Sequence, residues 1–288
     1  MDGVEAAASV EEDLAAGEGS AVLVEAAPAA VAPAAAGRFL GKEKTMIPQQ
    51  QLDEFVIRLS HAAGNNLQSV ILYGSAADGE FHREFSNVNL LCVLRDASLP
   101  QLVGLADSVD SWTRLHHPAP LIMTKDEMNR SADVFSIEFM DMKRRYKVLY
   151  GEDVLLKLDV PMHLHRAQLE YELREKLILL RQSILAAARD EKRLWEIMLS
   201  SLSAFTTLFR HALIALGDPG ARHSRETIRA LHSRIPFDTS PFEQLFDIRE
   251  HRAERKQLDP RQTLDNYLHA IQQVTAAVDT MLDSPQKA

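Results

Sequence analysis

The sequence predicts an α+β protein in which a small domain with a mixed β-sheet is followed by an all-helical bundle. Short apolar runs that end at turn residues alternate with amphipathic stretches up to about residue 160. From about residue 162 onward, only helical periodicity occurs. The chain of 288 residues, with 46% hydrophobic and 25% charged residues, has the composition of a globular protein of one or two domains.

The first 46 residues differ in composition from the rest of the chain. Fourteen of them are alanine, and more than half of the net charge of −9 lies in this segment. Such a stretch offers few bulky side chains to bury, so ordering it costs more entropy than burial returns. We expect residues 1–46 to form a disordered tail that is dispensable, and residues 284–288 to form a second, short tail. The alternatives are a transit peptide, which the acidity disfavours, and a translation start at Met46.

Residues 50–160 are expected to form the domain with the mixed sheet. Gln51–Ala63 carries its apolar residues on one helical face and is followed by a glycine that ends the helix. Further helices are expected at Leu99–Leu115 and Val134–Tyr146. The strands are expected at Val70–Tyr73, Val88–Leu94, Pro120–Met123 and Lys147–Tyr150.

Residues 161–283 are expected to form the helical bundle. In His163–Arg189 and Lys192–Leu216, apolar residues recur every three or four positions, which is typical of an antiparallel bundle. A short helix is expected from Ser224, and Asp259-Pro260 is a start signal for the last helix. The same spacing predicts that three aromatic residues lie in the core: Trp195, Phe205 and Phe209.

Charge, hydropathy and cysteine content exclude several classes of function. The excess of 41 acidic over 32 basic residues argues against a general nucleic-acid-binding protein. No uninterrupted apolar run approaches the ~18–20 residues that a membrane span needs, and the N-terminal segment is a poor signal peptide. The single cysteine, Cys92, excludes an intramolecular disulfide and a cysteine-based zinc site. These features predict a cytoplasmic protein that does not bind membranes.

One segment of the chain carries chemical information. Gly74-Ser75 follows an expected strand as a tight turn, and Asn87-Val88-Asn89 leads into the next expected strand. Glycine lets the backbone approach an anion closely, serine adds a hydroxyl donor, and the N–H groups at a helix start point at the anion. Residues two apart on a strand lie on one face, so Asn87 and Asn89 are expected to point the same way.

This segment resembles the signature of the polymerase-β-like nucleotidyltransferase superfamily. The order of a mixed domain and a helical bundle is similar to that of kanamycin-nucleotidyltransferase-like proteins, whose bundle resembles HEPN domains. The resemblance implies that Gly74 and Ser75 hold the phosphates of a nucleoside triphosphate. It also implies two Mg²⁺ ions, held by alternating acids on the second strand and by a third acid on a later strand, which activate the attacking oxygen and stabilise the leaving pyrophosphate.

The sequence departs from this signature at the expected metal ligands. Asn87 and Asn89 stand where the two aspartates are expected, and the strand expected at Pro120–Met123 carries no acid. Hard cations favour carboxylates over neutral amides. We therefore expect a retained phosphate-binding turn without a metal site or family catalytic residues. Mg²⁺ could then bind only through acids of the intervening loop: Asp78, Glu80 and Glu84.

Two further acids, Glu138 and Asp141, lie three residues apart on the expected helix Val134–Tyr146. They share a helix face, as the carboxylates of acid–base sites do. Because three basic residues follow at positions 143–145, we expect ion pairs on the surface.

Three functions remain open from the sequence. The first is a degenerate nucleotidyltransferase, a pseudoenzyme that binds a nucleotide and acts in regulation. The second is an active nucleotidyltransferase that transfers a nucleoside monophosphate to a small molecule or a protein hydroxyl. The third is a non-enzymatic module whose helical bundle forms a homodimer or binds a protein partner. The bundle lacks the arginine–histidine spacing of RNA-cleaving HEPN domains, so ribonuclease activity is not expected.

Overall fold

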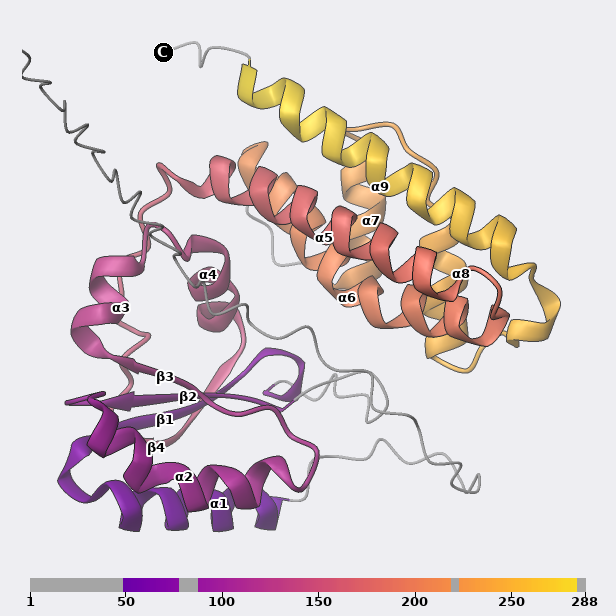
Figure 1. The fold of residues 1–288 in the computed structure, drawn as a ribbon. Helices are drawn as coiled ribbons and strands as arrows, with labels where there is room; N and C mark the ends of the chain where they lie inside the picture. Colours follow the sequence, from indigo (N-terminus) through magenta and orange to yellow (C-terminus); the bar gives the residue numbers. More distant parts are fainter. Residues whose placement is uncertain (1–48, 78–87, 219–222, 284–288) are drawn as a thin grey trace, which may run out of the picture. The chain divides into compact units, whose positions relative to one another are not determined.

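The computed structural model describes residues 49–77, 88–218 and 223–283 of the chain. A four-stranded mixed sheet with its helices precedes five further helices, which confirms the expected α+β class (Figure 1). The two expected tails, residues 1–46 with Met46 and residues 284–288, lie outside the described residues.

The helices are α1 (Gln49–Ala63), α2 (Leu99–Thr113), α3 (Lys125–Ser131), α4 (Ser136–Arg144), α5 (His165–Ala187), α6 (Glu191–Ala215), α7 (Ser224–His232), α8 (Ser240–Arg249) and α9 (Pro260–Asp283). The strands and 3₁₀ turns are β1 (Leu67–Tyr73), β2 (Asn89–Leu94), β3 (Leu121–Thr124), β4 (Tyr146–Gly151), η1 (Gly64–Asn66), η2 (Gly74–Ala76) and η3 (Arg255–Gln257).

The strands follow the order β3-β2-β1-β4 across the sheet. β1 lies between β2 and β4 and is antiparallel to both, whereas β3 runs parallel to β2. In this register Tyr73, the last residue of β1, lies opposite Asn89 on one side and Tyr146 on the other. The end of β1 and the beginnings of β2, β3 and β4 therefore meet at the same end of the sheet.

Helices cover both faces of the sheet. α1 and α2 lie on one face and α3 and α4 on the other, as Figure 1 shows. Successive residues of β2 alternate between the two layers: Leu90 and Cys92 pack toward α1 and α2, and Leu91 and Val93 toward α3 and α4. Burial raises the pKa of the Cys92 thiol to about 12, so this cysteine is an unreactive core residue.

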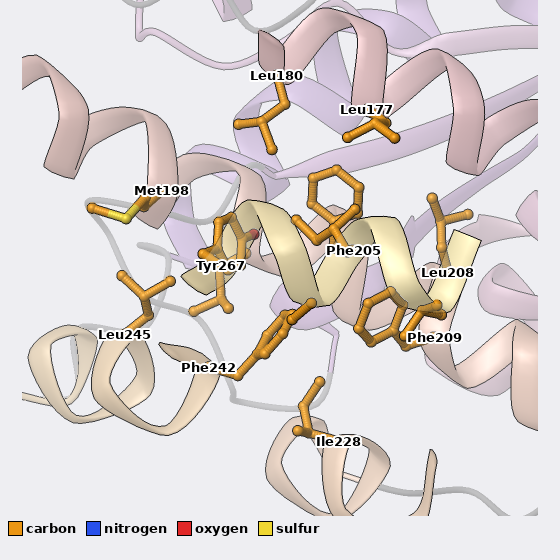
Figure 2. Close-up of a cluster of buried hydrophobic side chains, with 14 of the residues drawn as sticks. Leu177, Leu180, Met198, Phe205, Leu208, Phe209, Ile228, Phe242, Leu245 and Tyr267 are labelled. Atoms are coloured by element: carbon orange, nitrogen blue, oxygen red, sulfur yellow. The ribbon is translucent and has the colours of Figure 1, made fainter. Parts of the chain in front are cut away.

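The five helices α5–α9 share the largest hydrophobic cluster of the described residues. At its centre (Figure 2), Phe242 packs against Phe209 and Tyr267 with ring centroids 5.4 and 5.1 Å apart. Trp195 and Phe205 are buried as well, so all three aromatic residues expected in the core are found there. One residue of α4, Ile137, belongs to this cluster. The boundary placed between residues 160 and 161 stays a prediction.

α6 is the one described helix that is long and apolar enough to cross a membrane. Most of its apolar side chains are buried against α5, α7 and α9. This burial is typical of the central helix of a bundle.

Two short helices, α3 and α8, were not expected from the sequence, although each carries a start signal. In α3, Thr124 and Glu127 form a capping box, in which each side chain binds the other residue's backbone. In α8, Pro241 lies in the first turn and Phe242 in the buried face. The helix expected over Val134–Tyr146 is shorter than predicted, because the backbone is already extended at residue 145.

We expect Gly151→Ala to destabilise the protein strongly. Gly151 ends β4 with φ +73°, and a Cβ atom there would lie 2.0 Å from the backbone oxygen of Gln68. The left-handed conformation and the clash together should lower the free energy of unfolding by at least about 2 kcal/mol in urea denaturation. The control is Gly104→Ala in α2, where the new methyl group would meet nothing within 4 Å beyond its chain neighbours and the backbone of its own helix. Helix propensity predicts a gain of up to about 1 kcal/mol there, and equal losses in both variants would contradict the strain at Gly151.

Candidate nucleotide-binding site

The glycine–serine turn follows β1 directly, as the sequence predicts. Gly74 adopts φ +80°, a conformation that favours glycine, and begins the short turn η2. Its backbone N–H donates to the carbonyl of Arg145 at 3.0 Å, and its own carbonyl accepts from the N–H of Ala77 at 3.0 Å. The turn is thus tied to the residue between α4 and β4. Gly74 and Ser75 are half-buried, so the turn is accessible from solvent.

Asn89 lies beside this turn at the beginning of β2. A Cβ atom on Gly74 would lie 3.4 Å from Nδ2 of Asn89, so glycine leaves room for the amide. Asn89 is half-buried and opposite Tyr73 in the register. Asn87 lies outside the described residues, as do the loop acids Asp78, Glu80 and Glu84. That Asn87 and Asn89 occupy metal-ligand positions stays a prediction.

β3 provides no carboxylate at this end of the sheet. β3 begins with Leu121, which pairs with Leu91 of the parallel strand β2. Asp126 and Glu127 follow the opposite end of β3 and lie in the first turn of α3. Glu127 accepts a hydrogen bond from the backbone N–H of Thr124 at 2.7 Å, and Asp126 forms an ion pair with Arg130. The third acid of the two-metal signature therefore has no counterpart on β3.

The described residues around the turn do not fit a pair of Mg²⁺ ions. Asn89 offers a neutral amide oxygen and Leu121 an apolar side chain, whereas Mg²⁺ sites normally include at least one carboxylate. Within residues 49–77, 88–218 and 223–283, no group of three or more histidine, cysteine, aspartate or glutamate side chains could hold a metal ion.

Tyr73 connects the turn electrostatically to α4. Burial and the nearby charge of Glu138 raise the pKa of the Tyr73 hydroxyl to about 12, so the phenol stays protonated near neutral pH. Glu138 accepts a hydrogen bond from Nε2 of Gln168 at 2.7 Å. The Oε1 atom of Gln168 accepts hydrogen bonds from the hydroxyl of Ser136 and the N–H of Ile137. Glu138 thus has a hydrogen-bond partner on α5, and the surface ion pair expected for it stays a prediction.

Asp141, the next acid on α4, belongs to a second polar group that we call the Asp141 network: Asp141, His165, Arg210 and His211. Oδ1 of Asp141 lies 3.0 Å from Nε2 of His211 and forms an ion pair with Arg210. Nδ1 of His211 lies 2.9 Å from Nε2 of His165. Arg210 and both histidines are buried. Asp141 therefore does form an ion pair, but the expected place on the surface was wrong, because its partners come from the bundle core.

Every contact of the Asp141 network is satisfied when the carboxylate accepts the Nε2–H of His211 and one proton lies between Nδ1 of His211 and Nε2 of a neutral His165. Burial, then the charges of His211 and Arg166, lower the pKa of His165 to about 4. Burial opposes ionisation of Asp141, but the His211 hydrogen bond and the Arg210 charge outweigh it and lower the pKa of the carboxyl. Asp141 is therefore ionised and His165 neutral near pH 7.

α4 thus joins three parts of the chain. It contacts η2, it hydrogen-bonds α5 through Ser136 and Glu138, and it binds α6 through Asp141. The sequence analysis missed this role, although a signal was present. Arg210 and His211 interrupt an otherwise apolar run between Phe209 and Ala212, and buried charged residues are rare unless they are paired.

Comparison with solved structures identifies the fold. The crystal structure of a spectinomycin adenyltransferase from Enterococcus faecialis with ATP and spectinomycin matches 78% of this chain and 98% of its own, with a TM-score of 0.50 and 14% sequence identity. The chain has a nucleotidyltransferase fold. This confirms, at the level of the fold, the resemblance inferred from the Gly74-Ser75 segment.

Other matches to the nucleotidyltransferase fold are weaker. A nucleotidyltransferase-like protein from Exiguobacterium sibiricum matches 82% of this chain and 81% of its own at 11% identity and a TM-score of 0.32. A toxin–antitoxin structure with AMP-PNP matches 47% of this chain and 97% of its own at 16% identity and a TM-score of 0.27. Both scores are too low to carry an argument. No protein-family model matches the sequence, and no curated protein does.

Proposed function

We propose that this protein binds a nucleoside triphosphate at the Gly74-Ser75 turn and acts in nucleotide binding or regulation, as a degenerate nucleotidyltransferase of the cytoplasm. The observation that carries the proposal is the pairing of a left-handed glycine turn with Asn89. The N–H of Gly74 donates to Arg145, so the donors that would suit a phosphate are the hydroxyl and the backbone N–H of Ser75. The neighbouring strand offers an amide in place of a carboxylate.

Electrostatics favours metal-independent binding at such a turn. An aspartate at position 89 would repel a triphosphate unless a divalent cation stood between them. An asparagine removes that repulsion and lets the amide nitrogen donate to a phosphate oxygen. The spectinomycin adenyltransferase was crystallised with ATP, which supports a triphosphate as the ligand class. We expect no nucleotidyl transfer by two-metal catalysis, because neither Asn89 nor the β3 segment supplies a carboxylate.

Calorimetric titration of ATP, GTP and CTP into the full chain, with and without Mg²⁺, tests the proposal. The parent protein should bind at least one nucleotide with an affinity that Mg²⁺ does not increase. The double variant Asn87→Asp/Asn89→Asp should lose affinity without Mg²⁺ by roughly tenfold or more, and Mg²⁺ should restore it. Asn65→Asp is the control for added charge, because it places one carboxylate at the exposed turn η1. It should leave binding unchanged.

Two results would contradict the proposal. If no nucleotide binds to the parent with or without Mg²⁺, the turn has lost nucleotide binding, and the function is to be sought in the helical bundle. If the parent binds only with Mg²⁺, a metal site exists after all. The loop acids Asp78, Glu80 and Glu84 would then be the first residues to replace, and an active nucleotidyltransferase would be the better description.

A further inference from the structure

Asp141 fastens α4 to the helical bundle. Its Oδ1 atom lies 3.0 Å from Nε2 of His211 and forms an ion pair with Arg210. The side chains of Arg210 and His211 are 9 and 0% exposed, so water competes little for these contacts. A displacement of Asp141 would leave a buried charge unpaired, which is strongly unfavourable. The position of this part of α4 is therefore determined by α6.

Gln168 of α5 fastens the beginning of the same helix. Its Oε1 atom accepts hydrogen bonds from the hydroxyl of Ser136 at 2.9 Å and from the N–H of Ile137 at 3.1 Å. Its Nε2 atom donates to Glu138 at 2.7 Å. α4 has only nine residues, so contacts near its beginning and at Asp141 leave it little freedom to shift or rotate against the bundle.

The end of α4 is joined to the glycine–serine turn. Arg145 follows the last residue of the helix, and its carbonyl accepts the N–H of Gly74 at 3.0 Å. The N–H of Arg145 donates to the carbonyl of Met142 at 3.2 Å, which ties this acceptor to the last turn of α4. Asp141 precedes Arg145 by four residues, or about 6 Å along a helix axis. A displacement of Asp141 therefore reaches Gly74 over a single helical turn.

The shape of the turn depends on this hydrogen bond. The other backbone hydrogen bond described for Gly74 is internal to the turn, since its carbonyl accepts the N–H of Ala77 at 3.0 Å. Ser75 follows Gly74 directly, so the directions of its N–H and hydroxyl change with the orientation of the Gly74 peptide. Because hydrogen bonds weaken steeply when they are misaligned, a small rotation at Gly74 would weaken the contact of Ser75 with a phosphate.

We propose that Asp141 and Gln168 are positioning residues for the Gly74-Ser75 turn. By fixing α4 on the bundle, they hold the carbonyl of Arg145 where Gly74 requires it, and nucleotide affinity depends on this contact. The dependence on nucleotide rests on the function proposed above, whereas the shape of the turn is measurable without a nucleotide. Coupling between sites is reciprocal, so a molecule that loosens α4 from the bundle would weaken nucleotide binding, and a bound nucleotide would oppose that loosening.

The double variant Asp141→Ala/Arg210→Met of the full chain tests the proposal. It removes the contact and leaves neither charge of this ion pair in the core. In calorimetric titrations with ATP, GTP and CTP, the affinity for any nucleotide that the parent binds should fall at least about fivefold. In a spectrum of isotope-labelled glycine, which has 12 residues in this chain, the Gly74 amide should shift without nucleotide, because its N–H loses alignment with Arg145.

Two controls separate positioning from stability. Asp141→Asn keeps an oxygen that accepts from Arg210 and His211, so the nucleotide affinity and the Gly74 amide should stay close to those of the parent. Phe242→Leu removes packing at the centre of the bundle core, where Phe242 is fully buried. It should lower the urea midpoint but leave the affinity and the amide unchanged. Circular dichroism confirms that each variant is folded.

Three results would overturn the proposal: an unshifted Gly74 amide in the double variant, a nucleotide affinity that the double variant leaves unchanged, or an equal loss of affinity in Phe242→Leu. The last would attribute the effect to stability alone. If the parent binds no nucleotide, the proposed function fails by itself, and the amide still decides whether α4 positions the turn. If the double variant does not fold, Gln168→Ala replaces it and should shift the same amide.

Discussion

Replacing Asp141 with alanine is expected to lower the free energy of unfolding by about 3–5 kcal/mol, because it removes one partner of a buried ion pair. The side chain of Arg210 is only 9% exposed, so its charge would remain in the bundle core without the carboxylate. His211 would lose the acceptor of its Nε2–H and stay fully buried. Urea denaturation of the parent and the variant at pH 7.5 measures the loss.

A matched pair and a double variant separate this effect from the loss of any surface ion pair. Asp110→Ala removes the partner of Arg114, an exposed pair on α2, and should cost less than about 1 kcal/mol. The double variant Asp141→Ala/Arg210→Met should recover part of the loss, since no buried charge is left unpaired. A cost for Asp141→Ala as small as that for Asp110→Ala would show that Arg210 reaches solvent and that the network is not buried.

The protein is expected to lose about 2 kcal/mol of stability between pH 7.5 and pH 5, and His165 is the residue responsible. Its pKa is about 4 in the folded protein and 6.5 as the ordinary value, so only the unfolded chain takes up a proton in this range. Each pH unit below 6.5 then lowers the free energy of unfolding by about 1.4 kcal/mol, until the folded protein is protonated as well. The stability is complete above pH 6.5 and is lost as the pH falls toward 4. Asp141, whose pKa is lowered from 3.8, contributes a further loss only at still lower pH.

Denaturation midpoints in urea at pH 7.5, 6 and 5 provide the measurement. His165→Gln keeps a donor for Nδ1 of His211 and removes the titrating ring, so its stability should change little over this range. His269→Gln, at an exposed position of α9, should retain the pH dependence of the parent. If His165→Gln is as acid-sensitive as the parent, another group causes the effect.

The sequence predicts most of this fold because its apolar residues repeat with clear periods. Leu90 to Leu94 reads as a strand buried on both faces, and the structure places it at the centre of the sheet. α8 was not predicted because its ten residues are too few for a clear helical repeat of apolar positions. Phe242 of this helix nevertheless occupies the centre of the bundle core. Tertiary packing, rather than local pattern, determines such short helices.

The candidate site was predictable only in part. Gly74 and Asn89 are close in the chain and belong to a recognisable pattern, and their proximity follows from one antiparallel pairing. The Asp141 network joins residues that lie 46 to 70 positions apart, so no local spacing could reveal it. Position 141 was interpreted as a surface residue because its neighbours in sequence are basic, while its actual partners come from α6.

The hydrogen bond between Gly74 and Arg145 has a consequence for the order of folding during synthesis. β1 and β2 can pair as soon as both have left the ribosome, but β4 pairs with β1 only after the whole segment containing α2, β3, α3 and α4 has emerged. The N–H of Gly74 has no access to its acceptor before then. The Gly74-Ser75 turn therefore takes its native shape last in its domain, and nascent chains that stop short of residue 145 should carry the motif without that shape.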